Sequence, residues 1–253
     1  NYTMTEINTM MVTEIPKDCN LLLLNGPTVD LTADEKAMIS AYMQEGGNVL
    51  LLYGSTAEKL PNMDALLAEY GMNIVDGYVA DAQRCYQQVP YYIFPMMSLS
   101  GDMASNMETQ MALMMYARPM KLMDPARDTI TVNSFLTTST YGYAVTETDT
   151  VQGTYVVGAT ATEKGKFTVI TTPSVIDEGL ITTFNTLENS TLFMNAVNNN
   201  FEKTANVSIE PKSLLTTYNT VQNTGISTLV VVVVIPLVIL AYGFVVWLKR
   251  RKA

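Results

Sequence analysis

Histidine is absent from this chain of 253 residues, and cysteine occurs only twice. Without histidine, the Ser-His-Asp and Cys-His catalytic arrangements are excluded, together with most kinds of zinc site. Two cysteines, Cys19 and Cys85, are too few for a disulfide scaffold, and the sequence leaves open whether they pair. A glycine-rich phosphate-binding loop is also missing. These absences predict a protein that is not an enzyme and that holds no metal or cofactor.

Basic residues are scarce over most of the chain. The sequence has 15 Lys and Arg against 24 Asp and Glu, and four of the basic residues lie together at 249–252. The part before them therefore carries 11 basic residues and a net charge of −13. Such an acidic surface disfavours nucleic acid and anionic lipid headgroups as partners. About 226 residues precede the last apolar segment, which is enough to bury a hydrophobic core.

That last apolar segment runs from Leu229 to Leu248 and leads directly into the four cations. As a helix it is roughly 30 Å long, which matches the hydrocarbon core of a bilayer. Trp247 lies where an interfacial aromatic residue is expected, and Lys249, Arg250 and Arg251 form a positive-inside signal. A buried helix of a soluble domain is the alternative, but such a helix usually keeps a polar side. We therefore predict a transmembrane helix at 227–249.

This anchor predicts the layout of the whole chain. Residues 1–201 form an extracytoplasmic domain, the polar segment 202–226 is a stalk, and 250–253 is a cytoplasmic basic tail. The chain starts without Met or a signal sequence, so we expect a missing upstream part, either a signal peptide or another anchor with the beginning of the domain. The expected location is the cell membrane, with a single pass in this chain.

The first half of the domain has the pattern of a βαβ unit. Leu21–Asn25 is a continuous apolar run, typical of a strand that is buried on both faces. Thr32 and Glu35 form a capping box that begins a helix, and Gly46-Gly47 ends it. Asn48–Tyr53 is a second apolar strand, and strand, helix and strand in about 33 residues predict parallel pairing with a right-handed crossover.

The pattern then repeats less regularly. Pro61 opens a short helix that Gly71 closes, and a third strand is expected at 72–75 before the turn at Asp76-Gly77. These elements predict an α/β fold with a mostly parallel, doubly wound sheet. Methionines recur at helical spacing over 102–118, where packing in the core is favoured over binding of a soft metal or a peptide.

The following region changes in composition to Thr, Val, Tyr and Gly. Thr154–Ala161 and Lys166–Thr172 flank Glu163-Lys164-Gly165 and predict an antiparallel hairpin. Asn189–Phe201 predicts a helix whose apolar residues face inward.

A ligand face is predicted at the carboxyl ends of the parallel strands. In open α/β sheets ligands meet this edge, which here brings Asn25, Pro27 and Asp30 close to Gly54 and Ser55. Ser55 follows a buried strand where hydrolases place a nucleophile, but the full elbow pattern and a base are both missing. Asp76, Asp81 and Asp102 suggest a cation site, although their spacing fits no calcium loop and favours solvated carboxylates.

A set of short motifs follows in a fixed order along the chain from about Ile15 to the C-terminal tail. They are Pro27, Asp30-Leu31-Thr32, Glu35, Tyr42, Gly46-Gly47, Leu60-Pro61-Asn62, Leu66-Leu67, Tyr70-Gly71, Val79, Asp81, Thr138-Ser139, Asn189, Phe193, Asn195, Ile209, Pro211-Lys212, Pro236, Gly243, Trp247 and Arg250-Arg251. In this order they resemble the motifs of the gliding-motility-type (GldG-like) ABC-transporter auxiliary proteins. Asn199-Asn200 and the segment 85–106 depart from the family pattern.

The resemblance implies a glutamine-amidotransferase-like, flavodoxin-like outer domain without the amidotransferase nucleophile. It further implies an accessory, non-catalytic role beside an ABC permease and its ATPase. The candidate ligand or partner face is then Asn25, Pro27, Asp30, Gly54, Ser55 and Asp81. The candidate permease interface is Pro236, Gly243, Trp247, Lys249, Arg250 and Arg251. A surface adhesion or scaffold module and an anchored hydrolase are the alternatives, and the bound ligand, whether small molecule, glycan or peptide, stays open.

Overall fold

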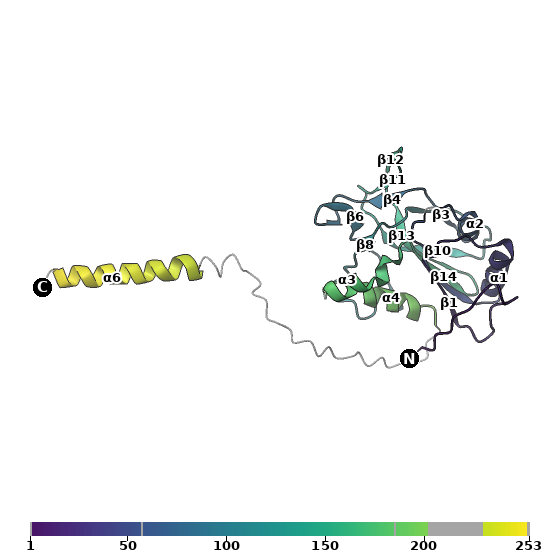
Figure 1. The fold of residues 1–253 in the computed structure, drawn as a ribbon, viewed down its shortest axis with the longest axis horizontal. Coiled ribbons are helices and arrows are strands. Elements are labelled where there is room, and N and C mark those ends of the chain that lie inside the picture. The colour runs from purple at the N-terminus through teal and green to yellow at the C-terminus, as the bar shows by residue number, and fades with distance from the viewer. Residues whose placement is uncertain (1, 57, 185, 202–229, 252–253) are drawn as a thin grey trace. The chain divides into compact units, whose positions relative to one another are not determined.

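A computed structural model describes residues 2–56, 58–184, 186–201 and 230–251. The chain divides into two compact units, Asn1–Thr204 and Ala205–Ala253. The predicted stalk at 202–226 lies outside the described residues. The first unit contains three β-sheets and four α-helices among its described residues (Figure 1).

The largest sheet has eight strands in the order β1-β2-β14-β13-β10-β7, with β9 beside β13 and β3 beside β9. Its strands are β1 Leu21–Asn25, β2 Asn48–Leu52, β3 Met72–Ile74, β7 Met96–Met97, β9 Met120–Leu122, β10 Thr131–Thr137, β13 Val156–Thr162 and β14 Lys166–Ile170. Two three-stranded sheets complete the unit. They consist of β4 Tyr78–Ala80, β11 Tyr143–Val145 and β12 Thr150–Gln152, and of β5 Cys85–Tyr86, β6 Val89–Ile93 and β8 Met114–Met115.

The predicted βαβ unit is present at the edge of the large sheet. β1 pairs parallel with β2, with Leu21 opposite Asn48. Between them, α1 (Ala33–Gln44) begins at the capping box, where the Glu35 N–H donates to Thr32 Oγ1 at 3.2 Å and the Thr32 N–H donates to Glu35 Oε2 at 2.8 Å. Gly46 has a positive φ of 103° just after the helix, a conformation that glycine adopts without steric cost.

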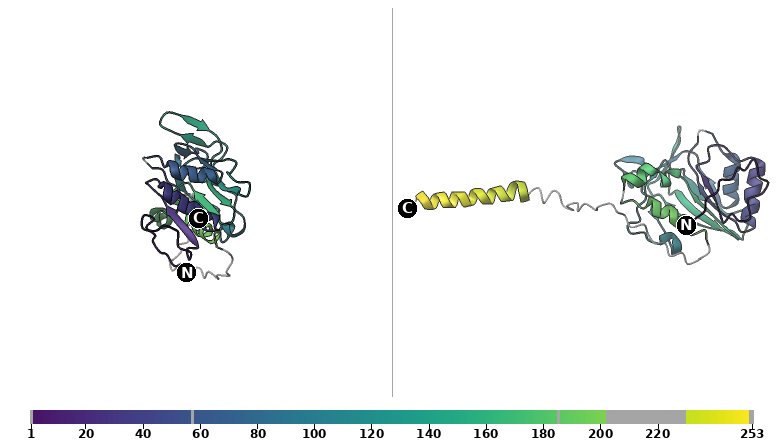
Figure 2. Two further views of the ribbon diagram at one scale, coloured as in Figure 1. Left: turned by 90° about the vertical axis from the view of Figure 1, so that its right-hand side faces the viewer. Right: turned by 60° about the horizontal axis from the view of Figure 1, so that its bottom comes forward.

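β2 supplies side chains to both faces of the sheet. Val49 and Leu51 belong to one core cluster, whereas Leu50 and Leu52 belong to the other. This alternation follows from the two-residue period of a strand. α1 and α2 (Pro61–Glu69) cover the first face, and α4 (Asn189–Asn198) covers the second. Figure 2 shows the two groups of helices on opposite sides of the strands in its right-hand view.

The expectation of a mostly parallel sheet is wrong. Of the eleven strand pairings described, only β1 with β2 and β2 with β14 are parallel. β3 is not the third parallel strand, because its exposed middle residue Asn73 does not suit a strand that is buried on both faces. β14 takes that position, since Phe167–Ile170 is buried throughout. The correct class is mixed α/β with mostly antiparallel sheets.

β14 arrives beside β2 through the predicted hairpin. β13 and β14 pair antiparallel, from Gly158 opposite Ile170 to Thr162 opposite Lys166. The hairpin prediction is therefore confirmed, and it explains how an antiparallel region joins the parallel strands.

The methionine-rich segment 102–118 is not the expected helix. Only Gly101–Ala104 forms a short 3₁₀ turn, and Asn106 and Gln110 have left-handed φ values of 55° and 50° that break a right-handed helix. Two asparagines of α4 bond its backbone instead. Asn189 pairs with both the N–H and the C=O of Leu113, and Asn195 Nδ2 donates to the Met103 carbonyl oxygen at 3.0 Å.

The expectation of a transmembrane helix at 227–249 is also overturned. In the part of the chain that the structure describes, no helix is long and apolar enough to cross a membrane. A π-helical turn covers Val230–Val234, and α6 spans the 17 residues Ile235–Arg251.

Candidate functional site

The carboxyl ends of the three parallel strands meet at one edge of the large sheet. Asn25 is the last residue of β1, Gly54 and Ser55 follow β2, and Thr172 follows β14. Together they line a hollow of about 640 Å³. Parallel strands explain this convergence, because they end at the same edge.

A second hollow of about 710 Å³ adjoins the first. The two share Ser55, Tyr78 and Tyr116 as lining residues. We call the two hollows together the strand-end cleft. The second hollow extends toward the loop after β11, where Thr146 and Glu147 line it.

The loop after β14 is held in place by hydrogen bonds at the floor of the smaller hollow. Thr172 Oγ1 donates to the Met115 carbonyl oxygen at 2.8 Å, and Ser174 Oγ accepts from the Met115 N–H at 2.9 Å. Gly54 is needed opposite this loop, since a Cβ there would lie 2.9 Å from Cδ of Pro173. The β2 and β14 loops therefore approach more closely than a larger residue would allow.

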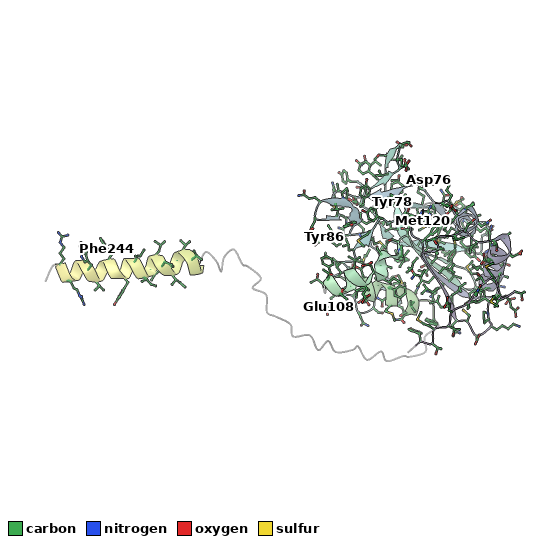
Figure 3. The ribbon with its side chains drawn as sticks, in the orientation of Figure 1. Asp76, Tyr78, Tyr86, Glu108, Met120 and Phe244 are labelled. Carbon is green, nitrogen blue, oxygen red and sulfur yellow. The ribbon has the colours of Figure 1, made fainter. Side chains whose placement is uncertain are left out.

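Four tyrosines gather beside the cleft around Tyr116. Its ring lies 5.6 Å from Tyr78, 6.1 Å from Tyr91 and 5.6 Å from Tyr92, measured between centroids. Tyr116 has a left-handed φ of 49°, which is a strained conformation for a bulky residue. Hydrogen bonding with Tyr92 raises the pKa of Tyr116. Tyr78, labelled in Figure 3, comes from β4, so distant segments build this aromatic group.

Arg118 lines the larger hollow together with Tyr78, Tyr91 and Tyr116. Its side chain is only 9% exposed, and its guanidinium carbon lies 4.4 Å from the ring centroid of Tyr53. Tyr53 Oη donates to Asp64 Oδ1 at 2.7 Å, and burial raises the Tyr53 pKa more than the nearby arginine lowers it. The buried Nη1 of Arg118 has no hydrogen-bond partner among the described residues.

Asp30 and Pro27 lie outside both hollows. The carboxylate of Asp30 accepts from the N–H groups of Asn62 at 2.9 Å and Met63 at 3.1 Å. These N–H groups belong to the first turn of α2 and have no partner within the helix. Asp30 therefore caps α2 from a distant loop.

Asp81 is also outside the cleft and is 1% exposed. Its Oδ1 accepts from the N–H groups of Gln83 at 3.1 Å and Arg84 at 3.2 Å, and its Oδ2 accepts from the Ser139 N–H at 2.8 Å. The carboxylate thereby joins the end of β4 to the loop that follows β10. Its bonds are those of a structural residue.

The arrangement offers little for hydrolysis or for metal binding. Ser55 has no described side chain within hydrogen-bond distance of its hydroxyl, so nothing described activates it. Asp76 forms a 2.9 Å ion pair with Lys59, and Asp81 is saturated by backbone donors. Over the described residues, no group of three Asp, Glu or Cys side chains is placed to hold a metal ion. Cys19 and Cys85 are free thiols.

The proposed interface residues of the C-terminal segment lie on α6. Trp247 stacks on Phe244 with centroids 5.7 Å apart, and the guanidinium of Arg251 lies 5.4 Å from the Trp247 ring centroid. A Cβ built at Gly243 would meet no described atom within 4 Å. Pro236 lies in the first turn of α6, where proline is tolerated.

A sequence model of one protein family covers most of this molecule. The family is described as an ABC-type uncharacterized transport system, and its model matches residues 1–171. The chain belongs to this family. The matched residues of this family member include β1, β2 and β14, and the match ends one residue after β14. Asn25, Ser55 and Arg118 thus lie inside the matched part, and Thr172 and Ser174 lie just after it.

Solved structures are similar to this chain at low sequence identity, and the first of them shares its fold. The mmIFT52 N-terminal domain is 18% identical, with a TM-score of 0.52 over 71% of this chain and 75% of that one. A thua-like protein from Bacteroides uniformis is 13% identical, with a TM-score of 0.43 over 70% and 67%. A cytoplasmic protein from Salmonella typhimurium is 11% identical, with a TM-score of 0.45 over 72% and 71%. No curated protein matches the chain in sequence.

Sequence reasoning missed the residues that come to the cleft from the middle of the chain. Tyr78, Tyr91, Tyr116 and Arg118 all line the larger hollow, but none of them was among the residues predicted for the ligand face. Arg118 is the last residue of the methionine-rich segment 102–118, for which a helix was expected. The available signal was that this arginine stands between two apolar neighbours, Ala117 and Pro119, which indicates a buried position.

Proposed function

We propose that this chain is a non-catalytic accessory component of an ABC transport system, acting outside the cell through its α/β domain. In this role the strand-end cleft binds a partner or a ligand. ATP is hydrolysed by a separate ATPase subunit, and a separate permease forms the transport path.

The observation that carries the proposal is the family match together with the position of the cleft. Family membership supports an auxiliary part in transport. The smaller hollow of the cleft lies at the carboxyl edge of β1, β2 and β14, the edge at which open α/β sheets receive ligands, and the larger hollow adjoins it at Ser55. An aromatic group and a buried arginine beside it are features that fit binding better than catalysis.

Co-purification of the full chain tests the partnership. A tagged chain is isolated from native membranes in several detergents, and the expected companions are an ABC ATPase and a multi-span permease encoded by neighbouring genes. Recovery of neither in any detergent would contradict the proposal. Recovery of surface or matrix proteins alone would favour an adhesion or scaffold role.

The contribution of the cleft is tested by a matched pair of tyrosine variants. Tyr116→Ala removes the centre of the aromatic group, whereas Tyr141→Ala removes a ring of similar exposure away from the cleft. We expect Tyr116→Ala to reduce transport at least severalfold while Tyr141→Ala has no effect. Equal effects of the two variants would argue against a binding role for the cleft.

A Ser55→Ala variant tests the non-catalytic role. We expect any hydrolytic activity of the preparation to stay unchanged, because no base is placed beside Ser55. Loss of a hydrolytic activity in this variant would support the hydrolase alternative.

The proposed location is tested with a cysteine placed at Met10, which is 89% exposed. In a background where Cys19 and Cys85 are replaced by serine, Met10→Cys should react with a membrane-impermeant maleimide in intact cells. Labelling only after lysis would place the domain inside.

A further inference from the structure

Arg118 is a buried cation with an unused donor at the strand-end cleft. Its main-chain N–H is bound to the Thr171 carbonyl oxygen at 2.9 Å, and the Tyr53 ring covers one face of its guanidinium. The buried Nη1 has no partner among the described residues, and none of the ion pairs described for the chain includes Arg118. Arginine stays protonated in proteins, so its buried charge is best matched by an anionic group.

The planar shape of the Arg118 guanidinium favours particular kinds of anionic ligand. A guanidinium presents paired N–H donors in a plane, which suits the two oxygens of a carboxylate or of a phosphate. Ser55, which lines the same hollow, adds a hydroxyl donor at the end of β2. A single anionic group at Arg118 therefore has more than one donor within the same hollow.

The charges around the larger hollow distinguish a single anion from a polyanion. Glu58, Asp76 and Glu147 line it together with Lys59 and Arg118, so the lining carries a net charge of −1. Lys59 is already paired with Asp76. A nucleotide or another multiply charged phosphate would meet stronger repulsion from this lining than a single carboxylate beside Arg118.

The tyrosines define the rest of the ligand. The rings of Tyr91 and Tyr116 are stacked, with an interplanar angle of 16°, and both line the hollow that contains Arg118. Such rings offer a flat surface to an apolar or aromatic group. Tyr116 is 48% exposed although it is held in a left-handed conformation, which keeps its ring at the cleft.

We propose that the strand-end cleft binds a monocarboxylate ligand, with the carboxylate on Arg118 and an adjoining apolar or aromatic group against Tyr91 and Tyr116. This inference rests on the proposed function, because it names the ligand class of the same cleft. A free organic acid and the C-terminal carboxylate of a peptide share this chemistry.

Phenylacetate and phenylacetamide test the inference as a matched pair of probes. They have nearly the same shape, but only phenylacetate carries a charge. Isothermal titration with the purified full chain should give a dissociation constant in the millimolar range for phenylacetate, as expected for a ligand of about ten heavy atoms. Phenylacetamide should bind at least tenfold more weakly.

Variants then assign the two parts of the site. Arg118→Gln should abolish the preference for phenylacetate, whereas Lys164→Gln, a change of an exposed cation elsewhere, should keep it. Tyr116→Ala should weaken both probes by a similar factor and preserve the preference. Circular dichroism of each variant checks that it is folded. Arg118→Lys keeps the positive charge but lacks the planar guanidinium, so it should retain part of the preference for phenylacetate.

Three results would overturn the inference. These are equal binding of the two probes, a preference that survives Arg118→Gln in a folded protein, and tighter binding of inorganic phosphate than of phenylacetate. An N-acetylated dipeptide with a free C-terminal carboxylate, compared with its C-terminal amide, distinguishes a peptide source from a free acid. Because binding is measured on the purified chain, its failure is separate from a failure of the transporter to co-purify.

Discussion

Replacing Asp81 with alanine should destabilise the domain strongly without touching the strand-end cleft. The carboxylate is 1% exposed and accepts three backbone hydrogen bonds, from Gln83, Arg84 and Ser139. Alanine would leave these three N–H groups without their acceptor in a place where water has little access. The loop after β10 would also lose its tie to the end of β4.

The size of the effect follows from these bonds. A hydrogen bond to a charged group contributes about 1.5–3 kcal/mol, but three bonds to one carboxylate are not additive because the loops relax. We therefore expect Asp81→Ala to lower the free energy of unfolding by about 3–5 kcal/mol, a large part of the 5–15 kcal/mol typical of a domain. Asp81→Asn keeps one acceptor oxygen and should cost about 2 kcal/mol.

Urea unfolding followed by far-ultraviolet circular dichroism measures this difference. With an m-value of about 2–3 kcal/mol/M, the midpoint should fall by about 1.5 M for Asp81→Ala. Asp76→Asn is the matched control, because that carboxylate is 66% exposed and forms only a surface ion pair, so its midpoint should hardly move. A midpoint shift below about 0.4 M for Asp81→Ala would refute the structural role assigned to this residue.

Three further perturbations have definite expected outcomes. The hydrogen bond from Arg127 lowers the pKa of Glu163 below its ordinary value of 4.5. Folding therefore favours the ionised carboxylate, so its contribution to stability is present above pH 4.5 and is lost as the pH falls below that value. Glu163→Gln should make the acid dependence of the urea midpoint shallower. Burial raises the pKa of Tyr42 and Tyr53 above the ordinary value of 10.0. Folding favours their neutral forms, so the stability of the domain should decline as the pH rises above about 10. Absorbance at 295 nm should show fewer of the 14 tyrosines ionised at pH 11 in the folded protein than in urea. Gly77→Ala would place a Cβ 2.2 Å from the Val145 carbonyl oxygen at a φ of 94°. We expect this variant to lower the thermal midpoint by several degrees. Gly101→Ala is the control and should have a smaller effect, because Gly101 also has a positive φ but its Cβ would meet no atom nearby.

The local part of the fold was predictable because its causes lie within short stretches of sequence. The capping box of Thr32 and Glu35 and the stop at Gly46 fix the bounds of α1 within one element. The hairpin of β13 and β14 follows from two β-prone runs around a glycine turn. The placement of β14 beside β2 was not predictable, since it joins segments whose sequence patterns are equally compatible with other partners.

Some residues of the candidate site were likewise predictable from the sequence, and others were not. Asn25, Gly54 and Ser55 were predicted together because each follows a strand of the parallel group, and they line the same hollow. Asp30 and Asp81 are short acidic residues in loops, and only the structure shows that backbone N–H groups occupy their oxygens. Arg118 and Tyr116 belong to the segment 102–118, whose methionine spacing predicted a helix that the structure does not have, so their position at the cleft was not predicted.

The late arrival of β14 has a consequence for how the protein is made. Asn48 Oδ1 accepts from the Lys166 N–H across 118 positions of the chain, and the parallel pairing of β2 with β14 begins at the same place. Contacts of such long range form slowly, because a large loop must close before the pairing stabilises it. During synthesis, a nascent chain that ends before β14 has β1 and α1 but lacks both the central strand and the edge of the cleft. Binding of the proposed ligand would therefore report completion of the sheet, and a chain truncated before Lys166 should be retained by chaperones rather than function as a smaller domain.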